Sequence, residues 1–159
     1  MNNVENFTRQ RDAKNKSFIA RGKEVTMGIN IQPHWEEALN IIKDKYHIIA
    51  YTASHESYAD SVLNYLEPDK KYFEYILYRC HYVLCNVNEM KFHVNDLSIL
   101  EEFCDLKDVV LIDNSVLSFA YHLDNGIAIS QFYDSKINTE LLDISNCLLK
   151  YADENNIRN

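Results

Sequence analysis

Two apolar runs in this sequence end abruptly in short polar residues whose side chains could do chemistry. A Val-Val-Leu-Ile run is followed by Asp113, Asn114 and Ser115, and a His-Ile-Ile-Ala-Tyr run is followed by Thr52. A carboxylate at the end of a buried strand is a candidate metal ligand or catalytic group, and a hydroxyl in such a place could hold a phosphate. Either set could instead cap the helix that follows, because Ser, Thr, Asp and Asn are preferred N-cap residues.

Strands and helices are expected to alternate along the chain, and they position these residues. The predicted elements are strands at 17–20 and 24–31, a helix at 34–45 with Pro33 at its first position, a strand at 47–51, a helix at 55–66, a β-hairpin insert within about 72–95, a short helix at 96–103, a strand at 109–112, a helix at 115–122, a strand at 126–130 and a last helix from the cap Thr139 to about 154. This alternation predicts an α/β fold with a mainly parallel sheet. In such a sheet the carboxyl ends of strands face the ligand crevice, which is where Asp113 is expected.

The composition indicates one globular domain. The 159 residues are 47% hydrophobic and 25% charged and include only three glycines and two prolines, so long linkers are not expected. We predict a basic polar arm over residues 1–16 and a single domain over residues 17–155. The four cysteines show neither CxxC nor zinc-finger spacing and are expected as free thiols. No run of 18 apolar residues occurs, which predicts no transmembrane segment.

The net charge of −8 is unevenly distributed. The first 30 residues contain six basic and three acidic residues, so the remainder is strongly acidic. An acidic body argues against a nucleic-acid partner. The basic N-terminal stretch suits an organelle-targeting segment and equally a partner-binding tail. The expected location is intracellular, with the mitochondrion as one reading and the nucleus or cytoplasm as the alternative.

Several segments in a fixed order resemble one known family. They are 47–54 (HIIAYTAS), 58–60 (YAD), 77–79 (LYR), 95–98 (NDLS), 109–119 (VVLIDNSVLSF), 132–134 (FYD) and 138–143 (NTELLD). Over roughly residues 25–150 the chain resembles the NLI-interacting-factor-like phosphatases, the small RNA polymerase II C-terminal-domain phosphatases of the haloacid dehalogenase superfamily. The resemblance implies a three-layer, Rossmann-like and mainly parallel α/β fold with a small β-hairpin insert.

The resemblance also implies a chemistry. In that family an Asp at the end of the first core strand attacks the phosphoryl group, and a second Asp two residues later acts as acid and base. Magnesium is held by the first of these, by a backbone oxygen and by the acid in the place of Asp113, which Asn114 follows. A hydroxyl in the place of Thr52 binds the phosphate, and a Lys in the place of Asn95 balances its charge.

This sequence departs from the family pattern where catalysis depends on it. No Asp-x-Asp pair precedes Thr52, Asn95 stands where the family has Lys, and Gln32 stands where it has Arg before Pro. Removing a covalent nucleophile typically costs several powers of ten in rate. We therefore expect no catalytic residue and no cofactor. Thr52, Asp113 and Asn114 are interpreted as remnants of the family site, with Thr52 and Asn114 mainly ending strands and forming turns.

The strand that carries the two family aspartates has no counterpart among these segments. Residues 17–20 could replace it, or a strand of another polypeptide could complete the sheet by β-addition. We expect a catalytically inactive phosphatase-fold protein that serves as a structural or binding subunit, with other protein subunits as partners. The alternatives are a Mg²⁺-dependent aspartyl-phosphate-type protein Ser/Thr phosphatase, whose motif is supplied elsewhere and whose metal ligand is Asp113, and a presequence or peptide receptor.

Overall fold

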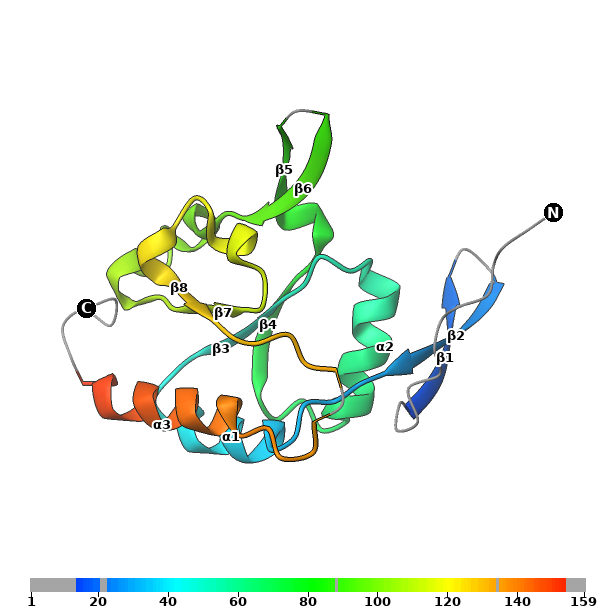
Figure 1. Ribbon diagram of the computed structural model, residues 1–159, viewed down its shortest axis with the longest axis horizontal. Helices are drawn as coiled ribbons and strands as arrows, with labels where there is room; N and C mark the ends of the chain where they lie inside the picture. Colours follow the sequence, from blue (N-terminus) through cyan, green and yellow to red (C-terminus); the bar gives the residue numbers. More distant parts are fainter. Residues whose placement is uncertain (1–13, 21–22, 88, 134, 154–159) are drawn as a thin grey trace.

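The structure is a computed structural model that describes residues 14–20, 23–87, 89–133 and 135–153 (Figure 1). Its helices are α1 (Trp35–Ile42), α2 (Glu56–Leu66) and α3 (Glu140–Tyr151). Its strands are β1 (Lys14–Ala20), β2 (Lys23–Ile29), β3 (Ile48–Tyr51), β4 (Phe73–Leu77), β5 (Tyr82–Val87), β6 (Met90–Asn95), β7 (Leu111–Asp113) and β8 (Gly126–Ala128). Short 3₁₀ turns connect several of them: η1 (Arg79–His81), η2 (Leu97–Leu100), η3 (Leu106–Asp108), η4 (Val116–Phe119) and η5 (Leu123–Asn125).

The strands form four separate pairs rather than one continuous sheet. β3 pairs with β4 and β7 with β8, both in parallel, whereas β1–β2 and β5–β6 are antiparallel. The two parallel pairs lie in the middle of the molecule in Figure 1, with α1 and α3 along one side. The fold is therefore mixed α/β, as predicted, but the described strands do not form the single, mainly parallel sheet that the sequence predicts.

The two helices α1 and α3 pack against each other although they come from opposite ends of the described chain (Figure 1). Ala38 and Ile42 of α1 and Leu148 of α3 are buried, as amphipathic helices require. Just beyond α1, the Tyr46 hydroxyl donates to the Leu148 carbonyl at 2.8 Å, and Lys45 pairs with Asp153 at 2.9 Å. α1 and α3 thus form a two-helix layer along one side of the parallel strands (Figure 1).

Residues 17–20 do not replace the missing core strand, so this prediction is wrong. The segment does form a strand, which begins at Lys14, but it pairs antiparallel with β2, from Lys14 opposite Ile29 to Ala20 opposite Lys23. The resulting hairpin is adjacent to α2 and projects away from the parallel pairs (Figure 1). A local hairpin closes with little loss of chain entropy, whereas reaching the central strands would close a longer loop. Residues 1–13 of the predicted arm lie outside the described part.

The predicted β-hairpin insert over 72–95 is confirmed only for its second half. β5 and β6 form an antiparallel ladder from Tyr82 opposite Asn95 to Val87 opposite Met90. β4, in contrast, pairs in parallel with β3 and belongs to the central strands. The buried carboxylate of Glu67 accepts a hydrogen bond from the Tyr72 backbone N–H at 2.7 Å and so fixes the entry to β4.

Several predicted helix starts and lengths differ in the structure. α1 begins at Trp35, because His34 adopts a left-handed conformation with φ of 60° that excludes Pro33 from the helix. The segments 96–103 and 115–122 contain only the turns η2 and η4, where Asp96 and Asp113 accept hydrogen bonds from backbone N–H groups two residues on. Such Asx turns compete with regular helix geometry.

The predicted cap Thr139 precedes α3 without capping it, since its side chain makes no cap hydrogen bond. Its hydroxyl donates instead to Asp143 at 3.1 Å, and the Asn138 side chain accepts the Glu140 N–H at 3.2 Å. Asn138 is therefore the functional cap of this helix. Among the described helices, none is long and apolar enough to cross a membrane.

Candidate functional site

The site residues predicted from the sequence lie where two parallel strands end. Thr52 directly follows β3, and its backbone N–H donates to the Leu77 carbonyl of β4 at 2.8 Å. Its hydroxyl oxygen accepts the Ser54 N–H at 3.1 Å, which closes a tight turn before α2. The Thr52 hydroxyl is therefore used in a turn and retains its own proton to donate.

Asp113 is the last residue of β7 and also starts a turn. One of its carboxylate oxygens accepts the Ser115 N–H at 2.7 Å, while its carbonyl accepts the Ile129 N–H at 3.1 Å. The side chain of Asn114 is exposed and lines a pocket of about 320 Å³ together with Asn30, Gln32, Ile129, Ser130, Gln131 and Phe132. Within the described part of the chain, no hydrogen bond links Thr52 to Asp113.

Gln32, which the resemblance predicts to stand in the place of the family arginine, forms a hydrogen bond to the start of the last helix. Its side-chain amide donates to the Asn138 side chain at 2.9 Å, so it joins the link before α1 to the start of α3. A neutral amide in this place supplies a structural hydrogen bond and no positive charge.

An aromatic pair, which the sequence does not predict, connects the end of β3 to the start of β5. The rings of Tyr51 and Tyr82 meet edge to face with centroids 4.7 Å apart, and the Tyr51 hydroxyl donates to the His81 carbonyl at 2.7 Å. Burial raises the pKa of Tyr82 strongly, and the nearby carboxylate of Asp113 raises it further. Aromatic residues are crowded around 72–82 in the sequence, but no local pattern indicates which strands they connect.

Asn95, which the resemblance predicts to stand in the place of the family lysine, is fully buried at 0% exposure. Neither polar atom of its side chain has a hydrogen-bond partner among the described residues, although its amide lies close enough to the Tyr82 phenol to offset part of the rise in its pKa. Leaving a buried amide unpaired costs about 1–3 kcal/mol, so such a group calls for an explanation.

The residue after it, Asp96, is held by two neighbours. Its carboxylate accepts hydrogen bonds from the Ser98 backbone and hydroxyl, at 3.0 and 2.6 Å, and lies 3.2 Å from the His122 ring. These contacts, led by the Ser98 hydroxyl, lower the pKa of Asp96. The contact between Asp96 and His122 holds η2 against η5. It thereby also fixes the position of Asn95, the residue before Asp96.

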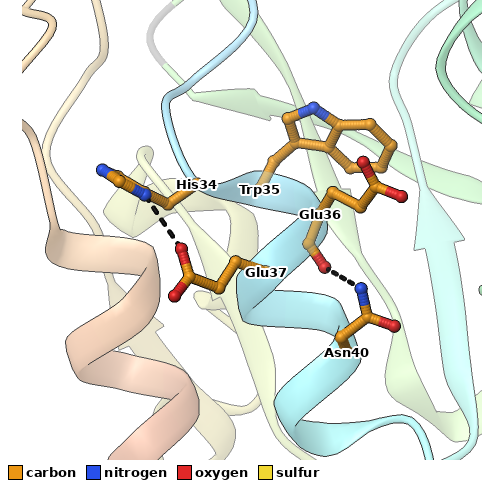
Figure 2. A pocket seen from close by; sticks show the side chains of 5 residues that line it. All are labelled: His34, Trp35, Glu36, Glu37 and Asn40. Carbon is orange, nitrogen blue, oxygen red and sulfur yellow. Dashed lines mark hydrogen bonds and ion pairs between the residues drawn. The ribbon is translucent and has the colours of Figure 1, made fainter.

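Asp113 is the metal ligand that the sequence predicts under the alternative, phosphatase function. No group of three or more His, Cys, Asp or Glu side chains that could hold a metal ion is found among them. Asp113 is one suitable oxygen ligand, but a resident Mg²⁺ needs further oxygen ligands around it. A second pocket, of about 510 Å³, is formed at the start of α1 by His34, Trp35, Glu36, Glu37 and Asn40 (Figure 2). It shares no residue with the surroundings of Asp113.

Comparison with known proteins places the chain in a family. Residues 4–158 match the family of NLI interacting factor-like phosphatases. The chain belongs to this family.

Three relatives illustrate the extent of the similarity. The chain is 41% identical over 113 residues to a CTD small phosphatase-like protein 2 of Dictyostelium discoideum, covering 71% of this chain and 19% of the relative. It is 35% identical over 120 residues to a CTD small phosphatase-like protein 3 of Caenorhabditis elegans, covering 76% and 40%. It is 30% identical over 116 residues to a CTD nuclear envelope phosphatase 1 of Xenopus laevis, covering 73% and 45%. The chain thus spans less than half the length of these relatives.

The described site has an acid and a hydroxyl, but a neutral amide at the position predicted for the lysine. The resemblance predicts that Thr52, Asp113 and Asn95 stand in the places of the family's hydroxyl, acid and lysine. Asn95 lies opposite Tyr82 in the β5–β6 ladder, the charge of Asp113 helps to raise the pKa of Tyr82, and Thr52 lies in a turn of its own.

Proposed function

We propose that the chain is a catalytically inactive phosphatase-fold protein that acts as a structural or binding accessory subunit of a larger protein assembly. The observation that carries this proposal is Asn95, a buried neutral amide in the place of the lysine that would neutralise a phosphate.

The physical reason is electrostatic. A cation 4 Å from a phosphate charge contributes about 1 kcal/mol in water and about 4 kcal/mol near a protein surface. An asparagine supplies none of this, and Asp113 would repel the phosphate unless a cation lay between them. A site without a covalent nucleophile would be slower by several further powers of ten. No cofactor is proposed for this function.

The proposed partners are other protein subunits. A strand that paired with both β3 and β7 would join the two parallel pairs into one sheet, and we propose that this completes the three-layer haloacid-dehalogenase-like arrangement. No nucleic-acid partner is proposed, because the chain beyond residue 30 is strongly acidic. Among intracellular locations, the relative named for the nuclear envelope favours the nucleus over the mitochondrion.

Turnover of p-nitrophenyl phosphate with Mg²⁺ tests the inactivity. We expect the purified chain to release no more p-nitrophenol than its Asp113→Asn variant does. Turnover that this substitution abolishes would overturn the proposal. Gel filtration of the endogenous protein from its native cells tests the accessory role: we expect it to elute in a complex, and elution as a free monomer would contradict that role.

A second candidate is a Mg²⁺-dependent aspartyl-phosphate-type protein Ser/Thr phosphatase that obtains its nucleophile from a separate segment. The unpaired edges of β3 and β7 favour it, because they leave room for a strand that could bring aspartates next to Asp113. Under this function Asp113 would be one Mg²⁺ ligand and Thr52 a phosphate donor. Restored turnover upon adding such a segment would select it.

A further inference from the structure

The β5–β6 hairpin has one face whose described side chains are all apolar. Residues directly opposite each other in an antiparallel ladder share a face, and the faces alternate along each strand. Val83 lies opposite Val94 and Cys85 opposite Phe92, and Met90 shares their side of the ladder. We call these five side chains the hairpin face. The other face is mixed and includes several polar residues (Asn86, Lys91 and His93).

The body of the protein covers only the base of the hairpin face. Val94 is 0% exposed where β6 packs against η4, and farther out the Tyr121 hydroxyl lies 3.1 Å from the sulfur of Cys85. Near the tip Met90 is 68% exposed, and Tyr121 itself is 54% exposed. Figure 1 shows the hairpin extending away from the central strands. A two-stranded hairpin is marginally stable unless it packs against another element, and no described element covers the outer part of this face.

The width of the hairpin face fits one helix. Neighbouring strands lie about 5 Å apart, and an α-helix with its side chains is about 10 Å across. The apolar face of a sheet is normally buried against a helix or a second sheet. An added strand would extend an edge of the hairpin and leave the face uncovered, whereas a single helix would cover both strands.

The charges around the hairpin face indicate a basic partner. Residues 82–96 and 116–124 build and border this face, and their only Lys or Arg is Lys91, which belongs to the other face. The acidic residues of these segments are Glu89, Asp96 and Asp124. Asp96 lies 3.2 Å from the ring of His122, the residue after Tyr121, so one of these acids is next to the exposed tyrosine. Lys and Arg beside the apolar side of a partner are therefore favoured over Asp and Glu.

The same charges disfavour three other occupants. A second copy of the chain would bring the same acids against each other, and an anionic lipid surface would be repelled by them. The side chains of the chain's own residues 1–13 carry no net charge, because Arg9 and Arg11 are offset by Glu5 and Asp12. A helix of a partner protein can combine apolar and basic residues on one side.

We propose that the hairpin face, extended by Tyr121, docks one amphipathic helix of a partner protein whose apolar side is flanked by Lys or Arg. Apolar residues at the spacing of successive helical turns would contact Met90 and Tyr121. The flanking basic residues would lie near Glu89 and Asp124. The inference rests on the proposed binding function and names the chemistry of its partner.

A fluorescein-labelled helical peptide of about 18 residues, with Leu along one side and Lys beside it, tests the proposal by anisotropy with the full chain. We expect saturable binding that Met90→Ser and Tyr121→Ser each weaken at least about tenfold, because each removes apolar surface that binding would bury. The matched control is Tyr75→Ser, which removes another exposed tyrosine from β4 and should change the affinity less than about twofold. A peptide with Glu for Lys, and a scrambled peptide of equal composition without an apolar side, should each bind at least about tenfold more weakly.

Two further measurements separate docking from a change in the fold. The three substituted side chains are exposed, so the Tm of the free variants should stay close to that of the parent chain. Amide hydrogen exchange of the complex should slow in β5 and β6 and stay unchanged in α3. Slower exchange in α3 without any change in β5 and β6 would place the peptide elsewhere and refute the docking surface.

The remaining outcomes distinguish this inference from the function on which it rests. No saturable binding, equal binding of the scrambled peptide, or equal loss in Tyr75→Ser and Tyr121→Ser overturns the hairpin face as a docking site and leaves the inactive-subunit proposal standing. Phosphate turnover that Asp113→Asn abolishes overturns inactivity instead, whatever the peptide does.

Three results would overturn the assignment of the occupant. The first is sedimentation with phosphatidylcholine vesicles that Met90→Ser abolishes, which would indicate a lipid surface. The second is a dimer of the free chain that Tyr121→Ser dissociates, which would indicate a second copy. The third is peptide binding at least about tenfold tighter in Phe7→Ser, which would indicate that the chain's own N-terminal residues occupy the face.

Discussion

Asn125 is predicted to be one of the most sensitive positions of the described fold. Its side chain is 4% exposed, and its amide donates to the carbonyls of Leu106 and Val109 at 2.6 and 2.7 Å. These bonds hold the segment before β7 against the start of β8. Asn125→Ala removes both donors and leaves the Val109 carbonyl without this donor, whereas the Leu106 carbonyl keeps the Val109 N–H at 3.2 Å.

The expected loss follows from these two bonds. A net hydrogen bond contributes about 0.5–1.5 kcal/mol, and a buried group left unsatisfied costs about 1–3 kcal/mol. Together they predict a fall in the free energy of unfolding of about 2–4 kcal/mol. For a chain of this size, each kcal/mol lowers the Tm by about 2–4 °C, so the Tm should fall by roughly 4–16 °C.

Urea and thermal unfolding followed by far-ultraviolet circular dichroism measure this loss. The control is Asn40→Ala, which removes an exposed asparagine whose amide donates to the Glu36 carbonyl within α1 at 2.9 Å. This control should change the free energy by less than about 0.5 kcal/mol. If Asn125→Ala lost no more than Asn40→Ala, the claim that Asn125 fastens β7 to β8 would be refuted.

Two further predictions concern packing and ionisation. A Cβ added at Gly126 would overlap the buried ring of Phe119, so Gly126→Ala should destabilise the fold by about 1–3 kcal/mol in the same unfolding assay; an unchanged midpoint would contradict this close contact. The hydrogen bond to Asp60 raises the pKa of Tyr78 to about 12, so its contribution to stability is complete below pH 10, the pKa of unfolded tyrosine, and is lost between about pH 10 and 12. Absorbance titration of tyrosinate at 295 nm should show late-ionising tyrosines, and Tyr78→Phe should remove the phase near pH 12 while the later ionisation of Tyr82 remains; an unchanged phase near pH 12 would disprove the assignment to Tyr78.

The sequence predicts elements whose signal is local. The apolar runs at 47–51 and 109–112 and the 3.6-residue periodicity of 34–45 give strands and helices near their observed bounds, because burial of a face leaves a regular pattern. β4 has no such regular pattern. Its sequence Phe-Glu-Tyr-Ile-Leu mixes half-buried and exposed residues without alternation, and its parallel pairing with β3 depends on the chain folding back over α2.

The site was predictable in its positions but not in its contacts. Polar residues at strand ends indicate Thr52 and Asp113 directly. Tyr51 contacts Tyr82, and the charge of Asp113 acts on Tyr82. Each of these interactions joins residues 31 positions apart, which no local pattern encodes. The burial of Asn95 is also a tertiary property, since the same residue at the end of an exposed hairpin would simply be hydrated.

The pairing of α1 with α3 has a consequence for the order in which the protein can form. Contacts such as those between Tyr46 and Leu148, or Lys45 and Asp153, link residues more than 100 positions apart. Contacts so distant in sequence slow folding, because the intervening chain must be closed before they form. During synthesis α1 emerges early and must wait for α3, with Ala38 and Ile42 exposed. We therefore expect a chaperone to bind the exposed apolar face of α1 until α3 has been translated.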